Sequence, residues 1–331
     1  MPPIDGLADT PYLATDSVFD LTDSPDSLAI LGGGPAGCEL AQAFARLGVE
    51  VSLVEAEGRL LPGIEPDAAM LLAEAFAADG ITVHTDTLVT SIGNRSGRVV
   101  LRTSSGREVS TQRLLVAVGR RPATAGLGLD AAGVRTDERG CVVVDEHLAT
   151  TAEGVYAAGD VTGLFPHTHA AYAMGRVAVG AALRRSRRPS FDATAIPQVV
   201  FTDPEIATVG AVEHDVTDRR ARVAFLPMSD VDRAITADRT RGFVKLIAGP
   251  RPVLGNLGGG RVLGATIMCE RAGELIHEPA LAMRTGMFTG RLAQTVHAYP
   301  TWSVAVQQAA AQFFGGYGGH TARRTGQPHG K

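Results

Sequence analysis

A glycine-rich stretch near the start of the chain constrains its fold more than any other feature. A short apolar run, 28–31, leads into three glycines at G-x-G-x-x-G spacing and then into an apolar helix. The three glycines are Gly32, Gly34 and Gly37. In this pattern one glycine allows a sharp turn, one lets the backbone approach a pyrophosphate, and one permits close packing of helix on strand. The N–H groups at the start of the helix suit bound phosphates. We therefore expect a Rossmann-like dinucleotide-binding unit, the alternative being a glycine turn without a ligand.

An acidic residue follows the next predicted strand. This strand spans 49–54 and ends in Glu55. The residue lies about 20 positions after the glycines, where this fold places a carboxylate that accepts hydrogen bonds from ribose hydroxyls. Because a carboxylate repels a 2′-phosphate, Glu55 favours NAD(H) over NADP(H). Arg59 weakens this prediction if its side chain reaches a phosphate; the alternative is a surface arginine.

Composition excludes several other classes of protein. Apolar residues make up 45% of the 331 residues and charged residues 20%, which is ordinary for a globular protein. The net charge of −4 does not indicate a nucleic-acid partner. The first residues lack the basic and apolar regions of a secretory signal, and the longest small-apolar run, 170–183, is too short to span a bilayer. We expect a cytoplasmic protein with no nucleic-acid or membrane partner.

The three cysteines, Cys38, Cys141 and Cys269, lie far apart in the sequence. No close pair is present, which argues against a disulfide framework and against a zinc site. We expect no metal centre, and we interpret all three cysteines as structural, with Cys38 buried in the helix after the glycines.

The first part of the chain predicts one mononucleotide-binding domain. Residues 1–26 are rich in Pro, Asp, Ser and Thr and have the character of a connecting segment. Residues 27–112 show a β-α-β-α-β order, with the second helix over 67–78, followed by an antiparallel meander. We expect the turns of this meander at 93–94 and 105–106.

The second part divides into three further segments. Residues 113–190 have predicted strands at 114–118, 142–144 and 155–157 and a helix over 168–185. Residues 191–314 read as an α+β unit, with strands grouped before helices. Its expected strands lie at 198–201, 222–228, 242–247 and 262–268, and its helices at 272–285 and 303–314. Residues 315–331, rich in Gly, Arg and His, are expected to be disordered.

Several motifs in a fixed order resemble one known family. They are the glycine motif, Gly119-Arg120-Arg121-Pro122, Gly154-Val155-Tyr156-Ala157-Ala158-Gly159-Asp160-Val161, and His297-Ala298-Tyr299-Pro300-Thr301. Together, over roughly residues 2–314, they resemble the class I pyridine nucleotide-disulfide oxidoreductases. The resemblance implies an α/β fold with a Rossmann-like NAD(P) domain inserted in a partial FAD domain, plus a C-terminal α+β dimerisation domain. It also implies hydride transfer between nicotinamide and flavin in a homodimer.

Site residues follow from the matched positions. Gly32, Gly34, Gly37 and Glu55 correspond to the NAD(P) site, and Glu39 to a glutamate near the nicotinamide. Asp160 and His169 correspond to flavin contacts, Asp160 at the ribityl chain and His169 at a helix start beside the flavin, and Gly119 is a further cofactor-binding position. Asp160 also follows a predicted strand and a glycine, where ligands bind in α/β folds; the alternative is a simple turn aspartate. Catalytic roles are expected for Glu39 and Tyr299.

Two motifs of the family are missing from the chain. The family begins with another G-x-G-x-x-G, which holds the ADP half of FAD, and carries a redox pair C-x-x-x-x-C in the same segment. The opening residues resemble a later, internal segment of the family. The chain is then either a start-site truncation or a naturally shortened homologue. We expect it to bind NAD(H) and to hold FAD weakly, because its FAD site is incomplete.

The C-terminal motif is altered as well. Disulfide reductases of the family have a histidine before the Pro-Thr and a glutamate a few residues later, whereas this chain has Tyr299 and Val304. His297 lies two residues too early to be the matched base. Tyrosine at this position resembles mercuric reductases, although their C-terminal cysteine pair is absent.

Three functions remain open from the sequence. The first is an NAD(P)H-dependent flavin oxidoreductase without the usual redox disulfide. The second is a non-catalytic, NAD-binding dimeric scaffold, and the third a mercuric-type metal reductase. The apolar helix 303–314 carries more than one apolar stripe, which favours a dimer.

Overall fold

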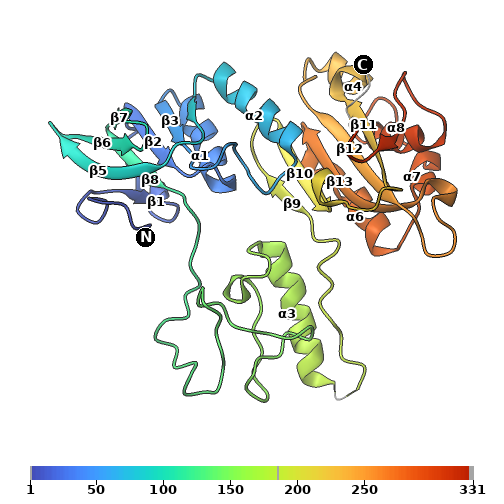
Figure 1. Ribbon diagram of the computed structural model, residues 1–331, viewed down its shortest axis with the longest axis horizontal. Helices are drawn as coiled ribbons and strands as arrows, with labels where there is room; N and C mark the ends of the chain where they lie inside the picture. The colour runs from blue at the N-terminus through green and yellow to red at the C-terminus, as the bar shows by residue number, and fades with distance from the viewer. Residues whose placement is uncertain (1, 185, 328–331) are drawn as a thin grey trace. The chain divides into compact units, whose positions relative to one another are not determined.

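The computed structural model describes residues 2–184 and 186–327 (Figure 1). The chain divides into two compact units. One combines Met1–Gly119 with Pro197–Lys331, and the other is Arg120–Ile196.

A parallel sheet carries the glycine motif. Its strand order is β1-β8-β2-β3-β4, and every pairing in it is parallel. The strands are β1 (Leu13–Ala14), β2 (Ser27–Leu31), β3 (Glu50–Val54), β4 (Thr82–His84) and β8 (Arg113–Val116). All residues of β2 are buried because the strand lies in the middle of the sheet. This confirms the expected Rossmann-like unit, which extends past the expected bound at residue 112 to include β8.

Two helices connect these strands, α1 (Pro35–Arg46) and α2 (Pro66–Ala78). Each has proline at its first position, where the missing N–H is not needed by the helix. The predicted end of the first helix is confirmed, because Gly48 follows it with φ +89° and donates its N–H to Ala45 O.

A separate antiparallel sheet forms the predicted meander. It comprises β5 (Val89–Arg95), β6 (Arg98–Thr103) and β7 (Glu108–Thr111). The turn expected at 93–94 is wrong, because β5 continues through both residues. The chain turns at Ser96 and Gly97, both at positive φ, and Asn94 Oδ1 accepts the Gly97 N–H to hold that turn.

A six-stranded antiparallel sheet forms the C-terminal part of the same unit, in the order β14-β11-β12-β13-β10-β9. The strands are β9 (Gln198–Val200), β10 (Glu205–Gly210), β11 (Arg222–Pro227), β12 (Phe243–Gly249), β13 (Arg261–Cys269) and β14 (Arg323–Arg324). The helices are α4 (Asp232–Thr236), α5 (Ala272–Leu275), α6 (His277–Arg284), α7 (Thr289–Gln294) and α8 (Val304–Ala311). The expected α+β architecture is confirmed; β10, α4 and α7 were not predicted.

Part of the expected disordered tail belongs to this sheet. β14 pairs with β11, and the Arg323 guanidinium bonds both carboxylate oxygens of Glu213. The expectation is therefore wrong for this stretch, because an ion pair and strand pairing hold it. Residues 328–331 lie outside the described residues.

The expected apolar face of the last helix is covered within the chain. Val304, Val306 and Ala309 of α8 are buried and belong to the core of the C-terminal part. The helix packs against α7, β11 and β12. The apolar character of α8 therefore does not by itself require a second subunit.

The second unit contains one long helix, α3 (Thr168–Leu183), close to the predicted bounds. The strands predicted at 142–144 and 155–157 are wrong. These segments form only single bridges, Thr136 with Val142 and Ala149 with Tyr156. Both are short apolar runs without a neighbouring strand long enough for a ladder.

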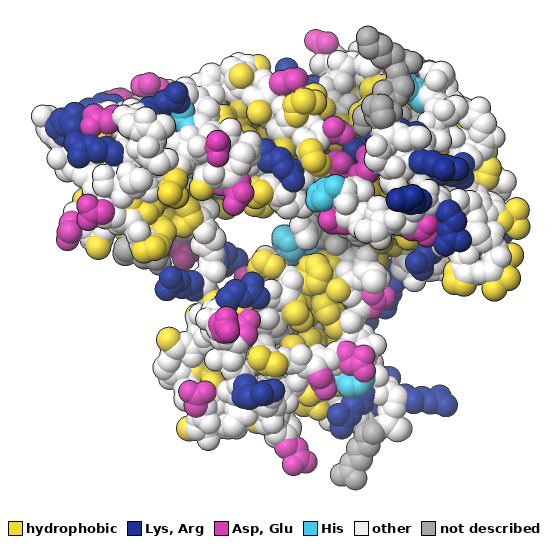
Figure 2. Space-filling model, viewed as in Figure 1, with side chains coloured by type: hydrophobic (Ala, Val, Ile, Leu, Met, Phe, Trp, Pro, Cys, Tyr) yellow, Lys and Arg dark blue, Asp and Glu magenta, His cyan; other side chains and the backbone are white. Residues whose placement is uncertain are grey.

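Charged side chains are spread over the surface (Figure 2). Arginines gather on the β5–β6–β7 sheet, where Arg95 and Arg102 both pair with Glu108. Across the described residues, no helix is both long and apolar enough to cross a membrane.

Candidate functional site

The glycine loop has one open side and two tightly packed glycines. Gly32 has φ +110°, and a Cβ on it would lie 2.6 Å from Ala117 O. A Cβ on Gly37 would lie 1.9 Å from Gly32 O, so the helix approaches the turn as closely as its backbone allows. A Cβ on Gly34, by contrast, would meet nothing within 4 Å. The space beside Gly34, at the start of α1, therefore suits a ligand that approaches the backbone.

Glu55 connects the end of β3 to this loop. Its Oε2 accepts the Gly33 N–H at 2.5 Å, and its Oε1 accepts the Glu57 N–H at 2.8 Å. The side chain is buried, so both bonds are protected from water. Glu55 thus holds the shape of the glycine loop, and its contact with a ribose stays a prediction.

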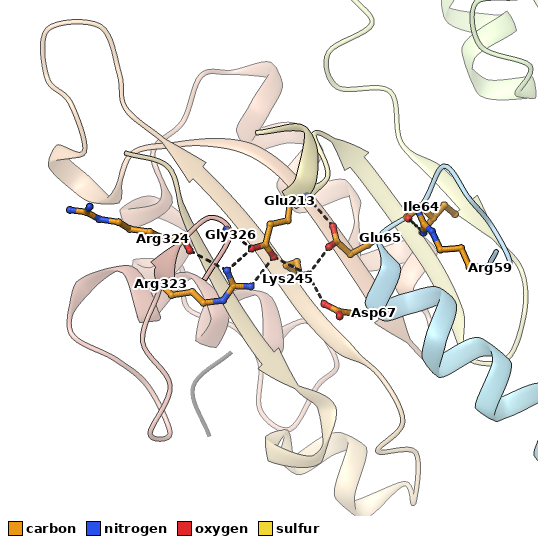
Figure 3. Close-up of polar contacts among 9 residues, drawn as sticks. All are labelled: Arg59, Ile64, Glu65, Asp67, Glu213, Lys245, Arg323, Arg324 and Gly326. Atoms are coloured by element: carbon orange, nitrogen blue, oxygen red, sulfur yellow. Dashed lines mark hydrogen bonds and ion pairs between the residues drawn. The ribbon is translucent and has the colours of Figure 1, made fainter. Parts of the chain in front are cut away.

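The segment after Glu55, residues 56–64, folds back over the loop. Leu61 N–H donates to Gly33 O at 2.9 Å, and the Leu61 side chain is buried. The Arg59 guanidinium donates to Ile64 O at 2.6 Å (Figure 3). It also donates to Pro62 O at 2.5 Å. Arg59 is therefore engaged by its own segment rather than extended toward a phosphate position.

Glu39 lies on α1 and contacts the end of β9. Its Oε1 accepts the Phe201 N–H at 2.8 Å. Burial raises the pKa of Glu39 above its usual range, although the bond from Phe201 opposes this. Nearby, Gln42 bonds Asp203 through both its amide oxygen and its amide nitrogen. α1 is thereby held to the start of the antiparallel sheet, which the sequence did not predict.

The three cysteines are free and buried. Cys38 Sγ donates to Gly33 O at 3.3 Å. Burial raises the pKa of Cys38 and Cys269 far above the usual thiol value, so both stay protonated at neutral pH. These positions agree with a structural role. No group of three or more His, Cys, Asp or Glu side chains in residues 2–184 and 186–327 is arranged to hold a metal ion.

The second unit holds two of the residues matched to flavin contacts. Asp160 is exposed, and its Oδ2 accepts a bond from Arg120 at 2.9 Å. At the start of α3 the rings of His167 and His169 stack with centroids 5.4 Å apart. Burial and the neighbouring His169 lower the pKa of His167, so it is neutral near pH 7. Gly119, in the first unit, has φ +110°.

The C-terminal motif contains two side-chain pairs. Tyr299 is exposed, and its hydroxyl donates to Asp232 Oδ2 at 2.7 Å, which raises the pKa of the phenol. His297 Nε2 lies 3.0 Å from Glu278 Oε2. Sequence reasoning missed both carboxylate partners, because each lies far from the motif along the chain.

A buried lysine outside every motif was also missed. Lys245 on β12 bonds three carboxylates, those of Glu65, Asp67 and Glu213 (Figure 3). The sequence did offer one indication of this ion pair, because a single lysine lies inside the apolar run 243–249. Lysine is almost never fully buried unless it is paired with an acidic group.

A glycine loop in a parallel sheet, joined to an antiparallel α+β part, defines a protein of the Rossmann type. Residues 1–175 match the pyridine nucleotide-disulphide oxidoreductase family, and residues 196–310 match the dimerisation domain of that family. The chain belongs to the pyridine nucleotide-disulphide oxidoreductase family. The resemblance seen in the sequence is thereby confirmed.

Individual relatives span several activities. The chain is 40% identical to a mercuric reductase of Streptomyces lividans, over 94% of this chain and 65% of that protein. It is 33% identical to an NAD(P)H dehydrogenase (quinone) of Mycobacterium tuberculosis, over 88% of this chain and 58% of that protein. Among solved structures, the HOCl-induced flavoprotein disulfide reductase RclA of Escherichia coli superposes with a TM-score of 0.85 at 30% identity, covering 94% of this chain and 70% of that one. The chain thus spans less than two thirds of these two curated relatives.

Proposed function

We propose that this chain binds NAD(H) and takes part in FAD-linked, NAD(P)H-dependent oxidoreduction, with hydride passing between nicotinamide and flavin. The observation that carries the proposal is the open space at Gly34, which lies at the start of α1 and next to Gly33, the residue bonded to the buried Glu55. A pyrophosphate fits this space because no side chain fills it and the helix N-terminus faces it. Membership of the family and the activities named for its relatives support the same function.

NAD(H) is the nucleotide that these residues favour. Glu55 is held against the glycine loop, and the exposed Glu57 follows two residues later. Two carboxylates beside a ribose repel a 2′-phosphate. Arg59, the nearest cation in the segment, is turned onto the carbonyl oxygens of Pro62 and Ile64. Segment 56–64 therefore offers no basic side chain to pair with the 2′-phosphate of NADP(H).

Flavin would supply the hydride-accepting ring when bound. Asp160 and His169 are the residues that we propose for flavin contacts, and Gly119 is proposed as a separate cofactor-binding position. The exposed Asp160 carboxylate suits hydroxyl groups of a ribityl chain. The neutral His167 beside His169 adds no positive charge at the start of α3. Glu39, with its raised pKa, is proposed near the nicotinamide.

A homodimer through the C-terminal part is proposed from the matched dimerisation domain. Light scattering on the purified chain tests it, and a monomer at micromolar concentration contradicts it.

The decisive experiment measures binding and turnover separately. NADH affinity is measured by fluorescence, and NADH oxidation is followed with added FAD and either a quinone or a dye as acceptor. Binding with turnover supports the oxidoreductase, whereas binding without turnover supports a non-catalytic scaffold. Absence of NADH binding overturns the proposal.

A metal reductase is the second candidate, supported by Tyr299 and by the mercuric reductase relatives. The buried, protonated Cys38 and Cys269 provide no thiolate for a soft metal. Adding Hg(II) to the turnover assay distinguishes the two candidates, since only a metal reductase oxidises NADH in response to it.

A further inference from the structure

Lys245 lies at the centre of a buried charge cluster that joins the nucleotide-binding part to the antiparallel sheet. The residue is 1% exposed. Its Nζ donates to Glu65 Oε1 at 2.7 Å, to Asp67 Oδ2 at 2.6 Å and to Glu213 Oε2 at 3.2 Å. Burying an ammonium group is unfavourable unless it is paired and hydrogen-bonded, and here every donor of the group has a carboxylate partner.

The cluster is extended by the C-terminal segment. The Arg323 guanidinium forms a two-pronged pair with the Glu213 carboxylate. The Glu213 N–H in turn donates to Glu65 Oε2 at 3.1 Å. Three acidic and two basic side chains therefore share one site, and Glu65 is bonded through both carboxylate oxygens.

Glu65 is an unusual residue for its position. It is the N-cap of α2, yet its side chain makes no capping bond to that helix. Ser, Thr, Asp and Asn are the side chains that cap helices well. The Glu65 carboxylate instead points to Lys245 and is buried (Figure 3). Its side chain therefore anchors the beginning of α2 to the neighbouring sheet.

The anchor connects directly to the glycine loop. Segment 56–64 lies between Glu55, which bonds Gly33 N–H, and Glu65, which bonds Lys245. Within it, Leu61 N–H bonds Gly33 O. One end of the segment thus frames the glycine loop, and the other end is fixed to β12.

We propose that Lys245 is a positioning residue for nucleotide binding, which holds segment 56–64 against the glycine loop through Glu65. The inference rests on the proposed NAD(H) site. Without the anchor, the start of α2 and the segment before it move more freely, and the nucleotide must order them when it binds. Affinity for NADH therefore falls, while the fold of each part persists.

The test compares variants of the cluster with a matched core variant. Glu65→Gln keeps the size of the side chain and one acceptor for Lys245, but it places an amide against the Glu213 N–H. Lys245→Met removes the cation. Leu246→Ala is the control, because Leu246 is also buried on β12 but belongs to the hydrophobic core of the C-terminal part. All three lower the melting temperature, so stability alone does not distinguish them.

NADH affinity and trypsin cleavage after Arg59 are the two readouts. Arg59 is the only Lys or Arg between Arg46 and Arg95, so a cut there reports opening of segment 56–64. For Glu65→Gln and Lys245→Met we expect about tenfold weaker NADH binding, or about 1.4 kcal/mol, and faster cleavage after Arg59. For Leu246→Ala we expect the wild-type dissociation constant and cleavage rate below the melting transition.

The outcomes separate this inference from the proposed function. If the wild-type chain binds NADH and folded Glu65→Gln binds it within about twofold, the positioning role is refuted and the nucleotide site stands. If Leu246→Ala weakens binding as much as Glu65→Gln, the effect is general destabilisation and the inference also fails. If the wild-type chain does not bind NADH, the proposed function falls and the inference falls with it. Should Lys245→Met not fold, Glu65→Gln alone decides.

Discussion

The Glu55 carboxylate accepts the Gly33 N–H at 2.5 Å, across 22 residues of sequence. This bond closes the glycine loop onto the end of β3. The acid at this position therefore stabilises the protein itself, in addition to the ribose contact that we propose for it. The carbonyl oxygen of the same Gly33 accepts the Leu61 N–H, so both backbone polar groups of this loop residue are bonded.

Replacement of Glu55 should therefore reduce stability and nucleotide affinity together. Glu55→Ala leaves the N–H groups of Gly33 and Glu57 without their acceptor. We expect the free energy of unfolding to fall by about 1–3 kcal/mol for the buried donor at Gly33. Urea unfolding and NADH titration measure the two effects. Glu57→Gln is the control. Because the Glu57 side chain is exposed, this substitution should leave the free energy of unfolding unchanged, but it should reduce the ratio of NADH affinity to NADPH affinity. Unchanged stability of Glu55→Ala would contradict the loop-closing role.

Two glycines of the motif should respond to alanine in opposite ways. Gly37→Ala brings a Cβ to 1.9 Å from Gly32 O, so α1 must shift. We expect a loss of about 1–3 kcal/mol of stability. Gly34→Ala meets open space and ordinary φ, and should keep or slightly raise stability. Its methyl group occupies the space proposed for the pyrophosphate, so NADH affinity should fall about tenfold. Thermal unfolding and NADH titration of both variants check this, and tight NADH binding by Gly34→Ala would place the phosphates elsewhere.

The parts of the fold that local sequence determines were predictable. The glycine spacing, the helix stop at Gly48 and the apolar strands on either side depend on neighbours within a few residues, and they predicted the Rossmann-like unit. The apolar runs 142–144 and 155–157 misled the prediction, because a strand also needs a partner with a matching ladder.

The remaining features depend on distant parts of the chain. Lys245 meets Glu65 across 180 residues, and Tyr299 meets Asp232 across 67. Neither of these contacts can be recognised from the spacing of residues in a single sequence. The prediction for the C-terminal tail was wrong for the same reason. Its Gly-rich composition predicts disorder, but the Arg323 guanidinium bonds the carboxylate of Glu213, 110 residues earlier in the chain.

Acid should weaken the contact between Glu213 and its two cations. Burial alone would raise the pKa of Glu213, but the bond from Arg323 and the charge of Lys245 lower it to about 2, against an ordinary value of 4.5. The stabilisation is therefore complete above about pH 4.5 and is lost as the pH falls toward 2. We expect Glu213→Gln to have a lower melting temperature than wild type at pH 7, and the difference to shrink between pH 4.5 and pH 3. A difference that is constant over this range would show that the carboxylate charge is not what stabilises the fold.

Tyr299 in the C-terminal motif is paired with a carboxylate. Its hydroxyl donates to Asp232, and this bond raises the pKa of the phenol, so the group carries its proton at neutral pH and is available as a proton donor. Tyr299→Phe should lower NADH-dependent turnover by about 100-fold if that proton reaches the reduced acceptor. Because the side chain is exposed, we expect the melting temperature and the NADH affinity to stay at their wild-type values. Asp232→Asn provides the matched control: the amide still accepts the hydrogen bond but without the charge, so the phenol should titrate at lower pH by ultraviolet absorbance. Equal turnover of Tyr299→Phe and wild type would remove Tyr299 from the catalytic residues.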